Sequence, residues 1–296
     1  MKKLIYILVL IFPFSCLRLD SNLYNNSKVD AYKWDNYGGA VDFYTPSSYN
    51  IPQNFMNEIT LVSKDTVVNK NYNIKALYIG NLVTVAQDTI ILYCHGNRDH
   101  MDFYWPRAKT LANVGGKNRF GVFMFDYRGY GLSEGESTEE SMNEDLTAAL
   151  EWLKSKGVTS SKLVIYGFSL GSACSSYEMA YPRSSLKPSK LILENPFASA
   201  ATMVADASRL SMPSSFFTNV KVDVSENIKR VNEPFMLLSS ADDKFLKPST
   251  HHDVVSANYK GLYKEVHSVP GADHGHLIDV WGLDNYRNTM EAFLLK

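Results

Sequence analysis

The sequence predicts an α/β fold in which a mostly parallel central sheet is flanked by helices. Short, continuously apolar runs recur from about residue 55 onward, and helix-like segments separate them. Runs that lack an alternation of polar and apolar residues are typical of central strands that are buried on both faces. Strands that alternate with helices are joined by right-handed crossovers, which makes neighbouring strands parallel.

Two early strands are expected at residues 59–62 and 74–79, with a polar turn at 69–73 between them. The central strands follow as short apolar runs. Ligand sites of parallel sheets lie at the carboxyl ends of the strands, so the residues after each run are candidates for chemistry. The runs are 89–94, 122–125, 163–166, 191–193 and 235–238, and a last strand is expected at 263–269.

The clearest helix is expected at residues 137–156. Ser137 is followed three residues later by Glu140, a spacing that predicts a capping box at the helix start. Gly157 is suited to end the helix. The apolar face has i, i+3, i+4 spacing and consists of Met142, Leu146, Ala149, Leu150 and Leu153.

The N-terminus differs in kind from the rest of the chain. Lys2 and Lys3 precede an apolar run at residues 4–14, a pattern typical of an export signal. The run is shorter than the roughly 20 residues that a membrane-spanning helix needs. A buried N-terminal helix or strand is the alternative, which Pro13 disfavours because proline breaks a helix. We therefore expect a signal peptide at 1–16, a polar tether at 17–36 and an α/β domain at 37–296.

The residues Pro13-Phe14-Ser15-Cys16 resemble the lipobox of bacterial lipoproteins. Ser15 matches that pattern, whereas Pro13 stands where the family usually has Leu. The resemblance implies that Cys16 is lipidated and that the exported protein is anchored to a membrane of the bacterial cell envelope. A plain cleaved signal peptide and secretion are the alternative.

The overall composition argues against nucleic acid as a partner. The formal net charge is -1, and no block of Lys and Arg interrupts the chain. Metal-dependent hydrolysis is disfavoured, because there is no His-Glu-x-x-His motif and His274-Gly275-His276 is a poor isolated ligand pair. Cys94 and Cys174 are expected to be buried free thiols.

The pentapeptide Gly167-Phe168-Ser169-Leu170-Gly171 is the first candidate for catalysis. It follows the apolar run 163–166 and precedes a helix-like stretch of small and apolar residues. A serine on a sharp strand-to-helix turn is exposed for attack, and glycines two before and two after it let the turn close. Ser169 is therefore expected to be a nucleophile.

The base and the acid should lie in loops after the last two strands. His274 is favoured over His276, because Pro-Gly-Ala-x-His places His274 just after a turn. Asp243 is favoured as the acid, and Asp242 and Glu194 are the other candidates. Along the chain, the triad residues then follow the order serine, acid, histidine. This order differs from that of chymotrypsin and from that of subtilisin, and it is the third order known for such triads.

An oxyanion needs two N–H donors. The backbone of Leu170, directly after the nucleophile, is expected to provide one. Gly96 lets the loop after residues 89–94 approach closely, so the backbone of Asn97 is expected to provide the other.

Four motifs occur in a fixed order along the chain. They are His95-Gly96-Asn97, the segment 125–135, Gly167-Phe168-Ser169-Leu170-Gly171 and Leu193-Glu194-Asn195-Pro196-Phe197. Together they resemble the α/β-hydrolase superfamily, in particular its serine-aminopeptidase-like and ABHD-type members, from about residue 55 to the C-terminus. The resemblance implies the α/β-hydrolase fold, a Ser-His-Asp triad, and neither a metal nor an organic cofactor.

Two details qualify this resemblance. Relatives often have His-Gly-x-x-Asp before the acid, whereas this chain has Ser239-Ser240-Ala241-Asp242-Asp243, a register that supports Asp243 and leaves Asp242 open.

Only about 40 residues separate Asn195 from Pro234, and a core helix must be among them, so any cap is small.

The expected activity is therefore serine-dependent hydrolysis of a small-molecule carboxylic ester or thioester, through an acyl-enzyme on Ser169. A peptidase or aminopeptidase of the same fold is the alternative enzyme, although the sequence displays no evident acidic cluster that would hold a substrate amine. A non-catalytic binding relative is the alternative from another class. It is disfavoured because each triad position has a chemically competent residue.

Overall fold

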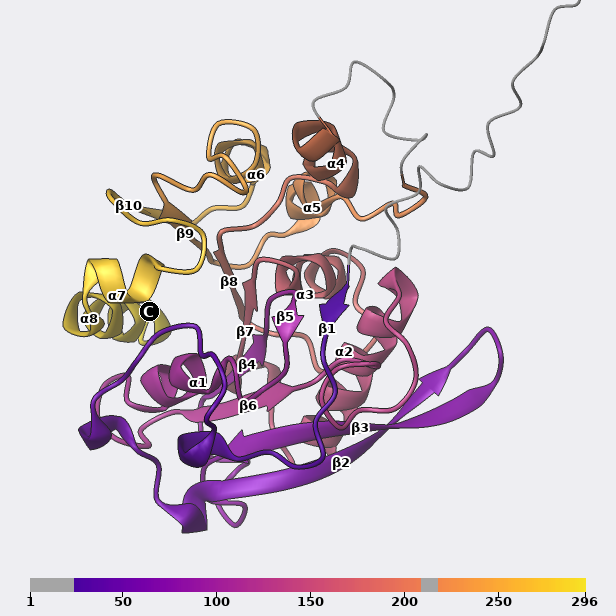
Figure 1. Cartoon of the computed structure of the whole chain (residues 1–296), viewed down its shortest axis with the longest axis vertical. Helices are drawn as coiled ribbons and strands as arrows, with labels where there is room; N and C mark the ends of the chain where they lie inside the picture. Colours follow the sequence, from indigo (N-terminus) through magenta and orange to yellow (C-terminus); the bar gives the residue numbers. More distant parts are fainter. Residues whose placement is uncertain (1–23, 209–217) are drawn as a thin grey trace, which may run out of the picture.

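The computed structural model describes residues 24–208 and 218–296. An eight-stranded sheet runs through the molecule in the order β10-β9-β8-β7-β4-β6-β3-β2 (Figure 1). The strands β2 and β3 form an antiparallel hairpin, β3 is antiparallel to β6, and the remaining neighbours are parallel. The predicted α/β fold is confirmed. The predicted signal peptide and Cys16 lie outside the described residues.

Each predicted strand overlaps an observed one. The shared feature of the central strands is burial along their whole length. The strands of the sheet are β2 (Met56–Asp65), β3 (Lys70–Ile79), β4 (Ile90–Cys94), β6 (Gly121–Phe125), β7 (Leu163–Phe168), β8 (Lys190–Glu194), β9 (Phe235–Ser240) and β10 (Lys264–Val269).

Helices cover both faces of this sheet (Figure 1). The side chains of α2, α3, α5 and α6 join one core cluster, and those of α1, α7 and α8 join the other. The helices are α1 (Trp105–Ala112), α2 (Glu139–Ser155), α3 (Gly171–Ala180), α4 (Ala200–Ser208), α5 (Val224–Asn227), α6 (His252–Asn258), α7 (Leu277–Trp281) and α8 (Leu283–Leu294). In the described part of the stretch where a small cap was expected, between β8 and β9, lie α4 and α5.

The strand β4 explains why these runs are continuously apolar. Ile90 and Leu92 pack into the core on the side of α2 and α3, whereas Ile91 and Tyr93 pack into the core on the side of α1 and α8. Successive side chains of a strand point to opposite faces. With helices on both faces, every position of the strand must therefore be apolar.

The start of α2 differs from the expectation by one residue. Thr138 is the cap: its Oγ1 accepts a hydrogen bond from the N–H of Ser141 at 3.0 Å, and the Ser141 hydroxyl accepts one from the N–H of Thr138 at 2.8 Å. The capping box predicted at Ser137 and Glu140 is wrong. The Ser137 hydroxyl donates instead to the carbonyl of Arg128, and Glu140 forms an ion pair with Arg183.

The polar segment before the domain is also different from the expectation. Residues of β1 (Asn25–Asn26) pair in parallel with β5 (Arg98–Asp99), in the loop after β4. The Tyr32 hydroxyl donates to the buried carboxylate of Asp126 at 2.6 Å. The tether expected at 17–36 is therefore wrong for residues 24–36, which belong to the folded domain, while residues 17–23 lie outside the described part.

None of the helices within residues 24–208 and 218–296 combines the length and the apolar character needed to cross a membrane.

Candidate active site

Ser169 lies in a sharp turn between β7 and α3, at the carboxyl end of the sheet. Its φ of 49° falls in the left-handed region, which residues other than glycine seldom adopt. Its N–H donates to the carbonyl of Glu194 in the neighbouring strand β8 at 2.9 Å. The turn is thus strained at Ser169 and fixed to the sheet beside it, a combination that is typical of functional sites.

Two glycines permit this turn. A Cβ on Gly171 would lie 2.0 Å from the carbonyl oxygen of Cys94, at the end of β4. A Cβ on Gly167 would lie 2.2 Å from the hydroxyl of Ser175 in α3. Both distances are far below van der Waals contact, so the close approach of α3 to β4 and β7 requires glycine at each position.

The side chains of Ser169, His274 and Asp243 form one continuous chain. The Nε2 atom of His274 lies 2.8 Å from the Oγ of Ser169, and its Nδ1 lies 2.6 Å from Oδ2 of Asp243. The three residues come from the loops after β7, β10 and β9, which meet at the same edge of the sheet. An imidazole held between a hydroxyl and a carboxylate is placed to accept the proton of that hydroxyl.

The alternative acid and base residues lie elsewhere. Asp242 accepts a hydrogen bond from the N–H of Gly271 at 2.6 Å and stays outside the chain of contacts. His276 is largely exposed and lies beside Asp279 at 3.2 Å. Glu194 is fully buried and bound by Arg107 at 2.7 Å. The structure thus brings His274 and Asp243 to Ser169, and it does not bring these three alternatives there.

Asp243 is held in its ionised form. Burial by itself would raise the pKa of this carboxyl, but the nearby imidazoles of His252 and His274 and the N–H of Leu246 outweigh burial, so the pKa lies well below its usual value. One carboxylate oxygen accepts from the N–H groups of Phe245 and Leu246 at 2.9 and 2.8 Å. The other faces His274, so both oxygens are fixed in position.

The sequence did not reveal the second imidazole beside Asp243. His251 and His252 follow Pro248, and both are fully buried. The Nδ1 of His252 lies 2.8 Å from the hydroxyl of Ser239, and its Nε2 lies 3.5 Å from Oδ2 of Asp243. The sequence around His252 does not indicate these contacts, because both partners come from elsewhere in the chain: the strand β9 supplies Ser239, and the loop after it supplies Asp243.

The two expected oxyanion donors lie in suitable loops. Among residues 24–208 and 218–296, no acceptor receives a hydrogen bond from the backbone N–H of Leu170 or Asn97. The side-chain oxygen of Asn97 accepts from the N–H of Asn25 and from the Tyr130 hydroxyl, each at 2.8 Å. These hydrogen bonds hold the loop that carries Asn97 against the N-terminal segment. The backbone N–H of Asn97 remains available to a ligand.

Arg107 is the second residue that the sequence did not reveal. Its Nη1 contacts both carboxylate oxygens of Glu194 at 2.7 Å, and its Nε is paired with Asp42. Its Nη2 donates to the carbonyl of Gly275 at 3.1 Å, directly after His274. The only hint in the sequence is Glu194, a carboxylate at the end of a buried strand, which requires a buried partner.

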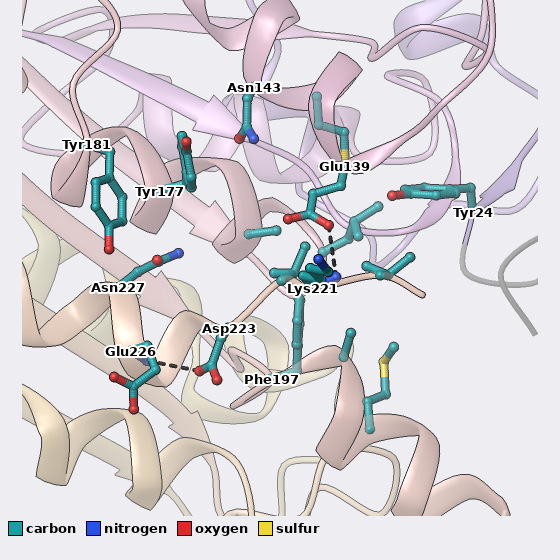
Figure 2. Close-up of a pocket in the computed structure, with 17 residues that line it drawn as sticks. Tyr24, Glu139, Asn143, Tyr177, Tyr181, Phe197, Lys221, Asp223, Glu226 and Asn227 are labelled. Atoms are coloured by element: carbon teal, nitrogen blue, oxygen red, sulfur yellow. Dashed lines mark hydrogen bonds between the residues drawn. The ribbon is translucent and has the colours of Figure 1, made fainter. Parts of the chain in front are cut away.

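A cavity of about 310 Å³ opens beside Leu170 (Figure 2). Its walls come from α2, α3, the start of α4 and the segment around α5, and Tyr24 closes one side. This volume is at the lower end of the range for small-molecule sites. Within the described ranges there is no group of three or more His, Cys, Asp or Glu side chains that could hold a metal ion.

Comparison with known proteins places the chain in a family. The model of the family described as serine aminopeptidase, S33, matches residues 86–225. Over 260 residues the chain is 30% identical to protein bem46 of Schizosaccharomyces pombe, an alignment that covers 87% of this chain and 81% of that protein. The chain belongs to the α/β-hydrolase superfamily.

Further similarities agree with this membership. The α/β-hydrolase is 30% identical over 185 residues to the alpha/beta hydrolase domain-containing protein aho-3 of Caenorhabditis elegans, with 62% of this chain and 52% of that protein covered. It therefore spans about half the length of that relative. An esterase of Pyrococcus furiosus superposes with a TM-score of 0.66 at 17% identity, with 92% of this chain and 97% of that chain covered. At this identity the structural likeness concerns the fold.

Proposed function

We propose that this α/β-hydrolase cleaves carboxylic ester or thioester bonds of small molecules through an acyl-enzyme on Ser169. The observation that carries the proposal is the position of His274, whose two ring nitrogens contact the Ser169 hydroxyl and the Asp243 carboxylate. In this arrangement His274 is the base, and Asp243 stabilises the imidazolium that forms.

The reaction follows from the contacts. As His274 Nε2 takes the proton of Ser169, the Oγ attacks the carbonyl carbon of the substrate, and the N–H groups of Leu170 and Asn97 donate to the resulting oxyanion. When the tetrahedral intermediate collapses, His274 returns the proton to the leaving alcohol or thiol. A water molecule then repeats these steps on the acyl-enzyme and releases the carboxylic acid.

A peptidase is the second candidate, and one observation speaks for it. Three carboxylates, those of Glu139, Asp223 and Glu226, line the cavity beside Leu170, although the sequence displayed no evident acidic cluster. Each of them already has a partner. Glu139 accepts from the N–H of Lys221, Asp223 caps α5, and Glu226 is paired with Lys229. Because none is reserved for a substrate amine, we favour the ester.

Covalent labelling tests the nucleophile. A fluorophosphonate probe should label the wild type, and Ser169→Ala should abolish labelling. Asp243→Asn should lower the labelling rate by about 10³-fold or more, whereas Asp242→Asn, its matched control, should label like the wild type. Undiminished labelling of Ser169→Ala would refute the proposed nucleophile. Greater loss in Asp242→Asn than in Asp243→Asn would reassign the acid.

The type of bond needs a separate measurement. A panel of p-nitrophenyl esters should be hydrolysed, and a matching panel of aminoacyl anilides should not. Faster release from the anilides would favour the peptidase instead.

Export and lipidation of Cys16 are part of the same proposal. Radiolabelled fatty acid should enter the wild type and not Cys16→Ser, and equal labelling would contradict the anchor. Eight residue steps separate Cys16 from Tyr24, which span at most about 28 Å. Since β1 is bound to the domain from Asn25 onward, such an anchor would hold the domain close to the membrane of the cell envelope.

A further inference from the structure

The cavity beside Leu170 has an apolar floor and a charged rim. Figure 2 labels the charged residues of this rim, which are Glu139, Lys221, Asp223 and Glu226. Buried apolar side chains from α2, α3, the loop after β8 and the start of α4 form the floor, and exposed or partly exposed charged side chains around Lys221 form the rim. Two buried amides, Asn143 and Asn227, interrupt the apolar walls. The floor residues are Met142, Ala173, Phe197 and Ala200.

Leu170 connects this cavity to the reacting atoms. It follows Ser169 directly, its N–H is a proposed oxyanion donor, and its side chain lines the cavity. An ester carbonyl held by that N–H would lie next to the residue whose side chain lines the cavity. Ser169, Asn97, His274 and the exposed Phe245 beside His274 are not among the lining residues, so Leu170 alone links the cavity to the reacting atoms. Because the leaving group departs toward His274, the cavity lies on the acyl side of the bond.

We propose that the cavity holds the acyl half of the substrate, an uncharged chain of about six to eight carbons. This inference rests on the proposed function and names its substrate class. A volume of about 310 Å³ lies at the lower end of the range for small-molecule sites, which favours a chain of this length over a long fatty acyl chain. An acetyl group would leave most of the apolar floor unfilled, and a long fatty acyl chain would extend beyond the cavity.

The charges at the rim restrict the far end of that chain. Among the described residues that line the cavity, the carboxylates Glu139, Asp223 and Glu226 outnumber the cation Lys221, although Lys229 outside the lining pairs with Glu226. A carboxylate at the end of an acyl chain would meet this excess of negative charge and lose its hydration. The cavity thus selects against half-esters of dicarboxylic acids.

A substitution that fills the cavity tests the assignment. Val222 is partly exposed and lines the cavity, so Val222→Phe should reduce its volume. Val83→Phe is the matched control, because Val83 is 90% exposed in the turn before β4, at the opposite end of that strand from Asn97. The measured quantity is the ratio of kcat/KM for p-nitrophenyl hexanoate to that for p-nitrophenyl acetate.

We expect Val222→Phe to lower this ratio by about tenfold or more, since the apolar contacts of several methylenes are lost. Val83→Phe should leave the ratio unchanged. An unchanged ratio in Val222→Phe would overturn the proposal. Equal rates for p-nitrophenyl hexanoate and the mono-p-nitrophenyl ester of adipic acid in the wild type would overturn the assignment of the charged rim.

Binding separates failure of this inference from failure of the proposed function. In Ser169→Ala, p-nitrophenyl hexanoate should raise the melting temperature, and adding Val222→Phe should remove that shift. If the shift occurs and disappears in this way while no ester is hydrolysed by the wild type, the cavity assignment stands and the proposed reaction falls. If esters are hydrolysed but the shift is insensitive to Val222→Phe, the cavity assignment falls.

Discussion

Arg107 and Glu194 form a buried ion pair beneath the loop that carries His274. One guanidinium nitrogen lies 2.7 Å from both oxygens of Glu194, and another donates to the carbonyl of Gly275 at 3.1 Å. Asn195, next to Glu194, donates to the carbonyl of His274 itself at 2.7 Å. The end of β8 and a helix on one face of the sheet therefore fix the position of the histidine loop together.

Arg107→Met should destabilise the protein strongly. The substitution leaves the buried carboxylates of Glu194 and Asp42 without their cation, which typically costs about 3–5 kcal/mol. Urea denaturation at pH 7 measures this loss, and the rate of fluorophosphonate labelling should fall with it, because the histidine loop loses a support. The exposed pair of Arg119 and Glu291 provides the control: Arg119→Met should cost less than about 1 kcal/mol. Equal losses in both variants would contradict this role of Arg107.

Gly171→Ala tests the close approach at the turn that carries Ser169. The new Cβ would lie 2.0 Å from the carbonyl oxygen of Cys94, and backbone must move to relieve that clash. We expect a loss of about 3 kcal/mol or more, measured as the free energy of unfolding, together with slower labelling of Ser169. Gly38→Ala is the matched control, since a Cβ there meets no atom within 4 Å among the described residues. Similar stability of the two variants would argue against a required glycine at 171.

The sequence predicted the elements whose cause is local. Each central strand is a continuous apolar run because its two faces meet separate cores, as Ile91 and Leu92 do in β4. The turn at Ser169 was predictable because its glycines lie within two residues of the serine. The positions of Asp243 and His274 followed from the order of strands, and the structure places His274 between Ser169 and Asp243.

What the sequence did not reveal depends on partners that are distant along the chain. Arg107 contacts Asp42, Glu194 and Gly275, which lie 65, 87 and 168 positions away. No local pattern distinguishes such a buried arginine from one on an exposed helix face. The same holds for the segment at 24–36, whose polar composition indicated a tether. Its polar groups are instead bound to buried carboxylates, such as that of Asp102.

His252 should act on catalysis through Asp243. Replacing it with Leu removes the imidazole that lies 3.5 Å from the Asp243 carboxylate and leaves the Ser239 hydroxyl without its partner. A lost interaction with a charged group is worth about 1.5 kcal/mol or more, so kcat should fall about tenfold while KM changes little. His252→Gln retains a donor near the same position and should recover part of the rate. If His252→Leu and His252→Gln lowered kcat equally, or if only KM changed, His252 would not act through Asp243.

Glu178 should make the stability of the protein depend on pH. Burial raises the pKa of this carboxyl to about 7, although the N–H groups of Arg183 and Ser184 partly oppose the rise. Because the folded pKa exceeds the unfolded value, the stabilisation is complete below about pH 4.5 and is lost as the pH rises through 7. The loss amounts to roughly 3 kcal/mol at most. Asp145, whose pKa is also raised to about 7 by burial, contributes with the same sign.

Glu178→Gln isolates this contribution, since the amide oxygen of Gln can still accept the hydrogen bonds from the N–H groups of Arg183 and Ser184. Urea denaturation at pH 5, 6, 7 and 8 should show a flatter profile for the variant, with a smaller slope that remains because of Asp145. Glu134→Gln is the control, because the N–H of Asn73 lowers the pKa of Glu134 and this exposed group stays ionised throughout the range. If Glu178 did not take up a proton in the folded state between pH 5 and 8, the wild type and both variants would show the same dependence of stability on pH. That result would contradict the raised pKa of Glu178.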